Sequence, residues 1–119
     1  MEQGASEKPI GAPTYRVLWH PEIKHDFSKI PQKLSESILE AAEHRLSRAP
    51  LLIGQPLKGT ANLLWRIGFS KYRIVYTLNV KVREVWVLSV QKRDIVYRDK
   101  HVQSLLRLAV SLQKEIENG

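Results

Sequence analysis

The chain has 119 residues, 43% of them apolar and 26% charged, and 19 Lys and Arg against 12 Asp and Glu give a net charge of +7. This length predicts a single domain with a sizeable core, and the basic balance favours a polyanionic partner such as nucleic acid, an anionic membrane or an acidic protein segment. The chain has no cysteine, no apolar run of the ~20 residues that span a bilayer and no apolar leader, so we exclude disulfides and thiolate metal sites and expect a cytoplasmic protein without membrane contact.

The first half of the chain predicts a tail, a strand and two helices. Residues 1–13 combine Gly and Pro with polar residues without any period, which predicts a disordered tail before one domain over residues 14–119. Tyr15–Trp19 alternates in the manner of a short edge strand. The segment Pro21–Arg48 carries apolar residues at helical spacing on both sides of a proline, which predicts a helical hairpin. These apolar residues are Ile23, Phe27, Ile30, Leu34, Ile38, Ala41 or Ala42, and Leu46.

Three runs rich in β-branched and aromatic residues follow a connector, Ala49–Leu63, that contains two Pro and two Gly. The runs are Leu64–Phe69, Tyr72–Leu78 and Glu84–Lys92, and the short polar gaps between them predict an antiparallel meander. With the edge strand at Tyr15–Trp19 they give a four-stranded, mainly antiparallel sheet. The fold class is therefore α+β, with the helical hairpin packed on one face of the sheet.

Alternation along these strands separates a cationic face of the sheet from an apolar one. The cationic face holds Arg66, Arg73 and Arg93, together with Gly68 and several small or polar residues. The opposite face is apolar throughout and needs a cover, which we expect the helical hairpin to supply. The residues of this apolar face are Trp65, Ile67, Phe69, Tyr72, Ile74, Tyr76, Trp86, Leu88 and Val90.

The period becomes helical again from Asp99 to about Glu117, which predicts a C-terminal helix with Asp99 as its N-cap. Its apolar stripe is expected to face either the core or a partner protein, and consists of Val102, Leu105, Leu106, Ala109, Leu112 and Ile116. The four histidines lack the spacing of metal ligands, and the sequence has no glycine-rich phosphate loop, nucleophile elbow or paired-carboxylate motif. We therefore expect neither a metal site nor a small-molecule cofactor.

Four short segments, by their order and spacing, resemble the RelE/ParE superfamily, the toxins of bacterial type II toxin–antitoxin pairs. They are Pro-Leu-Lys-Gly at Pro56–Gly59, Leu-Trp-Arg-Ile at Leu64–Ile67, Lys-Tyr-Arg-Ile-Val-Tyr at Lys71–Tyr76 and Val-Gln-Lys-Arg-Asp-Ile-Val-Tyr at Val90–Tyr97. The resemblance extends from about Tyr15 to Tyr97 and implies a small RelE-like fold. RelE-type members of this superfamily cut messenger RNA, generally on the ribosome, whereas ParE-type members inhibit gyrase.

The RelE-type pattern implies catalytic side chains at Arg66, Arg73, Arg93 and Tyr97. Lys58 matches a basic position in the loop before the sheet, and we expect it to contact RNA together with Lys71 and Lys92. The pattern departs at Gly68, where the best-known branch of the family carries a second lysine. The resemblance also implies two kinds of partner, a small acidic antitoxin and messenger RNA on the ribosome.

Cleavage of RNA by its own 2′-hydroxyl needs a base near that hydroxyl, positive charge on the phosphorane and help for the departing 5′-oxygen. Arg73 and Arg93 suit bidentate contact with a phosphate, and Arg66 and Lys58 add to the positive field. Tyr97 is the candidate base, since it has both the placement and the reach. We therefore predict an endoribonuclease toxin, with a ParE-like gyrase inhibitor and a non-catalytic relative that binds RNA or protein as the alternatives.

Overall fold

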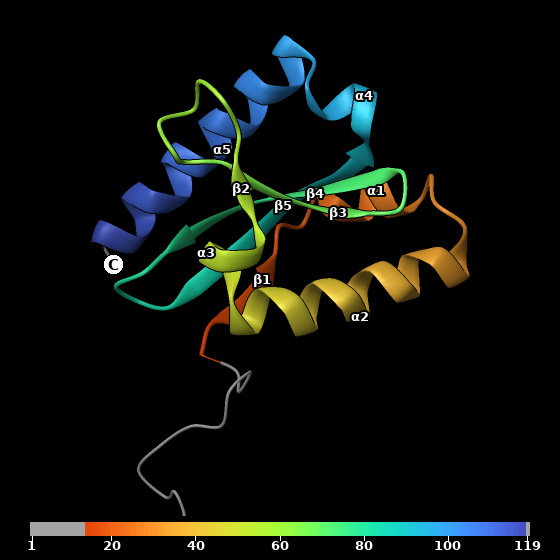
Figure 1. Cartoon of the computed structure of the whole chain (residues 1–119). Helices are drawn as coiled ribbons and strands as arrows, with labels where there is room; N and C mark the ends of the chain where they lie inside the picture. Colours follow the sequence, from red (N-terminus) through yellow and green to blue (C-terminus); the bar gives the residue numbers. More distant parts are fainter. Residues whose placement is uncertain (1–13, 119) are drawn as a thin grey trace, which may run out of the picture.

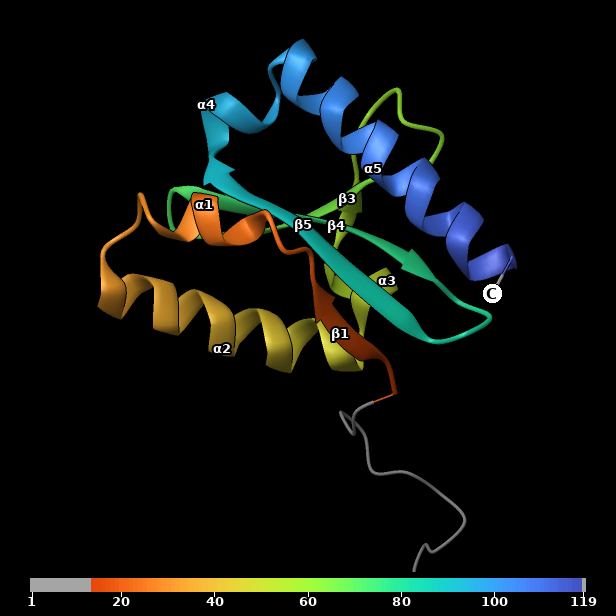
Figure 2. The ribbon, with the colours of Figure 1, turned by 180° about the vertical axis from the view of Figure 1, so that it is seen from behind.

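The computed structural model describes residues 14–118 and places a β-sheet between two layers of helix (Figure 1). α5 (Asp99–Asn118) and the single turn of α4 (Arg93–Val96) lie over one face, and α2 (Gln32–Arg48) lies under the other. The short α1 (Ile23–Phe27) sits beside the sheet next to β5 (Figure 2). The tail expected at residues 1–13 lies outside the described residues.

The sheet contains five strands in the order β1-β5-β4-β3-β2. β1 runs parallel to β5, and every other neighbouring pair is antiparallel. The predicted meander and edge strand are therefore confirmed, while the sheet has one strand more than expected. The extra strand is only two residues long and includes a proline, so it leaves no alternating pattern to recognise. The strands are β1 (Arg16–Trp19), β2 (Gln55–Pro56), β3 (Trp65–Phe69), β4 (Tyr72–Asn79) and β5 (Glu84–Lys92).

The helical hairpin covers the apolar face of β3 and β4, as predicted. The stripe of α2 enters this core through Ile38, Ala42 and Leu46, all of which are fully buried. Ala42 rather than Ala41 therefore belongs to the stripe. Tyr76 is also fully buried, and its hydroxyl donates a hydrogen bond of 2.6 Å to the carbonyl of Pro50. This bond ties the sheet to α3 (Pro50–Ile53), a turn of helix that follows α2 directly.

The predicted alternation is wrong in part of β5, because the β4–β5 ladder contains a register shift. Val75 pairs with Ser89, whereas the next residue of β4, Tyr76, pairs with Val87. The intervening Leu88 is an extra residue in β5, and such a bulge reverses the face of every residue before it. Trp86 and Leu88 therefore pack under α5 instead of under the helical hairpin, and Val85 and Val87 take the hairpin side.

α5 covers the second face of the sheet with a hydrophobic core of its own. Leu105 and Ala109 are buried there against Val75 and Leu88. The C-terminal helix thus begins where the sequence predicted, and its stripe faces the core. Gln113 fixes its far end by donating a hydrogen bond of 3.1 Å to the carbonyl of Leu78. None of the helices within residues 14–118 is both long and apolar enough to cross a bilayer.

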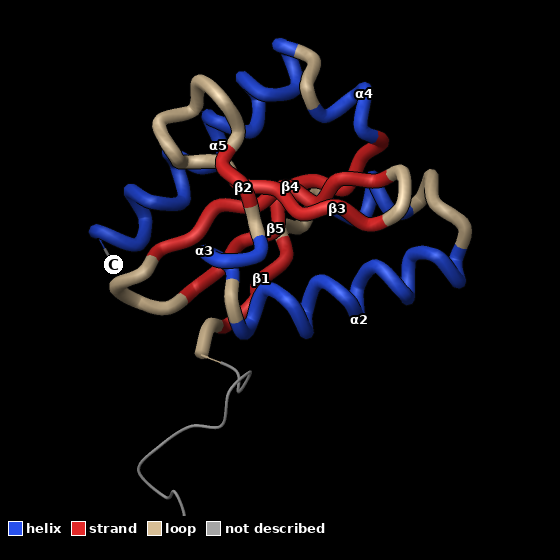
Figure 3. Tube along the Cα trace, viewed as in Figure 1, coloured by secondary structure: helices blue, strands red, loops and turns tan. Residues whose placement is uncertain are grey.

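This second core covers most of the face on which the sequence placed the arginines. The basic side chains are therefore left at one end of the sheet. The loop between β2 and β3, drawn in tan, rises from the sheet edge toward α5 (Figure 3). Leu57 and Leu64 at its two ends belong to the α5 core. The basic residues of β3 and of α4 therefore lie beside this loop, at the edge of the α5 layer.

Candidate active site

A pocket of about 540 Å³ opens where the β2–β3 loop, β3, α4 and the first turn of α5 meet. Four of the seven residues that the sequence predicted for the site line this pocket. The full lining consists of Pro56, Leu57, Lys58, Arg66, Arg93, Tyr97, Asp99 and Val102. Segments about 40 residues apart in the chain thus bring three basic side chains, a phenol and a carboxylate onto one concave surface.

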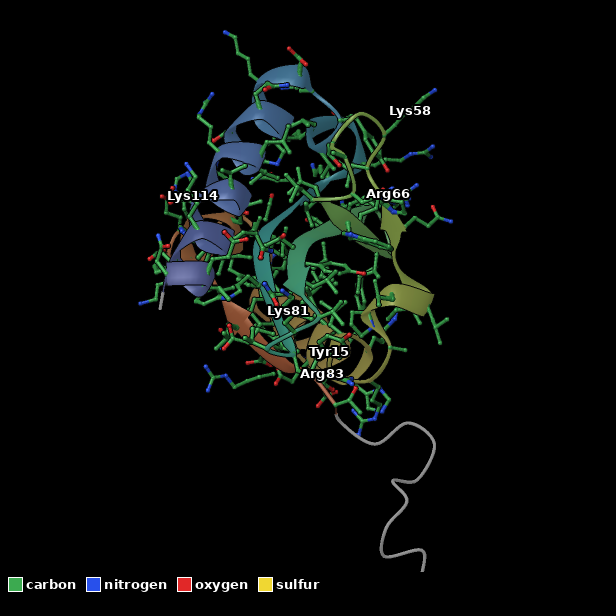
Figure 4. The ribbon with its side chains drawn as sticks, turned by 90° about the vertical axis from the view of Figure 1, so that its left-hand side faces the viewer. Tyr15, Lys58, Arg66, Lys81, Arg83 and Lys114 are labelled. Atoms are coloured by element: carbon green, nitrogen blue, oxygen red, sulfur yellow. The ribbon has the colours of Figure 1, made fainter. Side chains whose placement is uncertain are left out.

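The β2–β3 loop is closed by local hydrogen bonds that hold Lys58 at the pocket. The N–H of Leu57 donates to the carbonyl of Leu64 at 2.8 Å, and the buried hydroxyl of Thr60 donates to the carbonyl of Leu57 at 2.7 Å. Gly59 adopts a positive φ of 78°, a conformation that glycine reaches without steric cost. Lys58 and Arg66 consequently lie one above the other on the same side of the molecule (Figure 4).

Arg93 and Tyr97 reach the pocket through the turn that ends β5. The N–H of Arg93 donates to the carbonyl of Lys71 at 3.1 Å, which continues the ladder by one bond before α4 turns the chain back over the sheet. Tyr97 follows α4, and its ring centroid lies 5.7 Å from the guanidinium carbon of Arg66. A cation over an aromatic ring at this distance is attractive, so the two side chains support each other.

Arg73 lies on the same face of the sheet but does not line the pocket. It stands between Gly68 of β3 and Gln91 of β5 in the ladder, and its guanidinium donates hydrogen bonds to the carbonyls of Tyr72 (2.8 Å) and Ser70 (3.1 Å). A Cβ at Gly68 would lie 3.3 Å from Nη1 of Arg73. The guanidinium therefore lies against the glycine that departs from the family pattern, and supplies positive charge beside that position.

The remaining two predicted contacts lie outside the pocket. Lys71 is exposed in the β3–β4 turn, with its ammonium nitrogen 5.9 Å from the ring centroid of Tyr72. Lys92 pairs with Tyr72 across the ladder, and both residues belong to the opposite side of the sheet from Arg73 and Gln91. Any contact of these lysines with RNA would be made at the margin of the site.

Asp99 is the lining residue whose place in the pocket the sequence did not predict. Its position at the start of a helix was explained by capping, and its only other signal was its distance of two residues from Tyr97. Among the described residues, no group of three or more His, Cys, Asp or Glu side chains is arranged to hold a metal ion.

A second polar cluster lies under the start of α5, away from the basic pocket. The carboxylate of Asp26 accepts hydrogen bonds from the N–H of Val90 (2.9 Å) and from Nε2 of Gln91 (2.8 Å). The hydroxyl of Ser89 lies 3.0 Å from Nε2 of His101. Burial raises the pKa of Asp26 and lowers the pKa of His101, because both charged forms are poorly solvated there.

Comparison with known proteins gives relatives of one kind. No protein-family model matches the chain. Toxin RelG of Mycobacterium tuberculosis is 29% identical over 84 residues, which cover 71% of this chain and 97% of the relative. In the crystal structure of the toxin–antitoxin complex RelBE2 from the same organism, a chain superposes with a TM-score of 0.62 and 28% identity, over 69% of this chain and all of that one. Sequence and fold together support a RelE-like member of the RelE/ParE toxin superfamily.

The RelE-like fold also recurs in more distant structures. A mutant of E. coli toxin RelE in the free state superposes with a TM-score of 0.58 over 75% of this chain and 90% of that one, at 19% identity. Identity at that level supports the fold alone. In this RelE-like chain, the pocket between the β2–β3 loop and α5 is therefore the candidate for the toxin's chemistry.

Proposed function

We propose that this RelE-like toxin is an endoribonuclease that cleaves messenger RNA on the ribosome by attack of a 2′-hydroxyl on the adjacent phosphate. The observation that carries this proposal is the convergence of Lys58, Arg66, Arg93 and Tyr97 on one open pocket. A fold that served no polyanionic ligand would have no use for three basic side chains from a loop, a strand and a helix at one concavity.

The basic side chains suit the charge that develops in this reaction. The attacked phosphate becomes a phosphorane with additional negative charge, and fixed cations in a partly dry pocket stabilise that charge without reorganising. Arg66 and Arg93 present planar guanidinium groups, which can bind two phosphate oxygens at once. Arg66 is partly buried and its guanidinium lies over the ring of Tyr97, a contact that restricts its motion before RNA binds.

We further propose that a small acidic antitoxin binds this chain. The relative RelBE2 of Mycobacterium tuberculosis is a toxin–antitoxin complex, and an archaeal RelE of Pyrococcus horikoshii, 24% identical to this chain, was also solved as a complex with RelB. A net charge of +7 favours an acidic segment as the partner. On this proposal the toxin acts in the cytoplasm, where messenger RNA is translated.

The test is single-turnover cleavage of ribosome-bound messenger RNA by wild type and arginine variants. We expect Arg66→Ala and Arg93→Ala each to lower the rate on the order of a hundred-fold, as for other fixed charges that stabilise a transition state. Arg73→Ala reports whether the site extends along the sheet beyond the pocket. Arg107→Ala is the matched control, because it removes the same charge from an exposed position on α5.

The proposal fails if folded wild type leaves ribosome-bound RNA intact. It also fails if Arg66→Ala and Arg93→Ala cleave as fast as Arg107→Ala. A supercoiling assay with purified gyrase, run on the same preparations, then separates the ParE-like alternative from a relative that only binds RNA or protein.

A further inference from the structure

Asp99 is the only carboxylate among the residues that line the basic pocket. It lies in the first turn of α5, is exposed, and forms no ion pair with any lysine or arginine of residues 14–118. The neighbouring Asp94 differs in this respect, because its carboxylate lies 3.7 Å from the guanidinium of Arg98 and outside the pocket. Asp99 therefore presents an unneutralised carboxylate to the place where an RNA phosphate would bind.

A carboxylate in this position opposes the binding of RNA, because it repels the phosphate that the three basic side chains attract. A pocket that only bound a polyanion would be stronger without it. Asp99 is the first residue of α5, where the helix dipole favours a negative charge only weakly at an exposed position. This stabilisation does not explain why the carboxylate lines the pocket where a phosphate would bind.

We propose that Asp99 is a catalytic residue, the general base that accepts the proton of the attacking 2′-hydroxyl. This inference rests on the proposed endoribonuclease activity and names the residue that starts it. A carboxylate offers acceptor oxygens, whereas a phenol carries a hydroxyl that can donate, so Asp99 suits proton acceptance and Tyr97 suits proton donation. The two side chains line the same pocket and would serve opposite ends of the scissile bond.

The proton and bond changes balance within this pair. An oxygen of the Asp99 carboxylate takes the proton from the 2′-hydroxyl, and the 2′-oxygen forms a bond to the adjacent phosphorus. The bond from phosphorus to the 5′-oxygen breaks, and that oxygen takes the proton of the Tyr97 hydroxyl. The products are a 2′,3′-cyclic phosphate and a 5′-hydroxyl, and Tyr97 regains a proton from Asp99 through solvent.

The decisive variant is Asp99→Asn, because asparagine has nearly the same shape and the change removes the negative charge. We expect thermal stability close to that of wild type, equal or tighter binding of an oligoribonucleotide, and a cleavage rate lower by roughly a hundred-fold or more, the usual contribution of a general base. Asp99→Glu should recover part of the rate.

The matched control is Asp94→Asn, which makes the same chemical change outside the pocket and should cleave like wild type. If Asp99→Asn cleaves as fast as an active wild type, Asp99 only complements the dipole of α5 and this inference alone is overturned. If wild type binds RNA but never cleaves it, the proposed function is overturned and this inference with it.

Discussion

Tyr97 can contribute in two ways, through its ring, which contacts Arg66, and through its hydroxyl, which can transfer a proton. Tyr97→Phe keeps the ring on which Arg66 rests and removes only the hydroxyl. We expect RNA affinity and thermal stability close to wild type and a cleavage rate lower on the order of a hundred-fold, because only proton transfer is lost. Tyr97→Ala should weaken RNA binding as well, since Arg66 loses its support. Filter binding and single-turnover cleavage measure the two effects; equal loss of affinity in both variants would assign the role to the hydroxyl's binding contacts instead.

A second single-residue prediction concerns stability. A Cβ at Gly54 would overlap the hydroxyl of Tyr76, which is buried and bonded to the carbonyl of Pro50. Gly54→Ala should lower the free energy of unfolding by roughly 3 kcal/mol, because it overpacks the core and leaves a buried hydrogen bond unmade. Urea unfolding measures this loss. Tyr76→Phe removes the obstructing oxygen, so the double variant should be more stable than Gly54→Ala alone. If the losses of unfolding free energy in the two single variants simply add in the double variant, the overlap is contradicted.

At the scale of the elements, alternation predicted β3 and β4 correctly and failed in β5 for a definite reason. The segment from Val85 to Val90 is apolar at every position except Ser89, so both registers bury apolar side chains and the sequence does not distinguish them. The bulge at Leu88 then decides the faces of Trp86 and Val87. No residue pattern marks an inserted residue of this kind.

The candidate site was predictable where parity and family resemblance agreed. Together they pointed to Arg66 on β3 and to Arg93, which follows β5 directly, and both line the pocket. Arg73 has the same parity, yet it lies one step along the sheet with its guanidinium turned to local carbonyls. Asp99 was missed because its place in the pocket depends on how α4 turns the chain, which is a property of tertiary structure.

The docking of α5 on β5 should depend on pH through His101. Burial lowers the pKa of His101 in the folded chain, so as pH falls below about 6.5 the unfolded chain takes up the proton first and stability is lost. Burial raises the pKa of Asp26, which acts in the opposite sense and adds stability as pH falls from that raised value toward 3.8. His101→Gln removes the first effect and also the charge by which His101 lowers the pKa of Asp26, and both changes favour the folded chain at low pH. Its melting temperature should therefore fall less than that of wild type between pH 7.5 and pH 5.5; equal falls would exclude His101 as the source.

On the scale of the whole molecule, the positive charge extends well beyond the pocket. Lys81 and Arg83 lie at the tip of the β4–β5 hairpin, and Lys114 lies on α5, on other sides of the molecule from Lys58 and Arg66 (Figure 4). The guanidinium carbon of Arg83 lies 5.4 Å from the ring centroid of Tyr15, so Arg83 already makes a cation–π contact. The net charge of +7 alone therefore favours RNA binding over much of the surface. Specific binding requires the basic side chains of the pocket to contribute more binding free energy than those elsewhere.

Salt dependence of RNA binding distinguishes these two situations. For single-stranded RNA, the logarithm of the binding constant falls with the logarithm of the salt concentration, with a slope of about −0.7 for each phosphate that a basic side chain neutralises. Arg66→Ala should make this slope shallower by about 0.7, and Lys114→Ala, an exposed position on α5, should leave it unchanged. Titrations of a fluorescent oligoribonucleotide over a series of salt concentrations give the slopes directly. Equal changes in both variants would mean that RNA binds diffusely through the net charge. That outcome would contradict the prediction that the pocket binds the scissile phosphate.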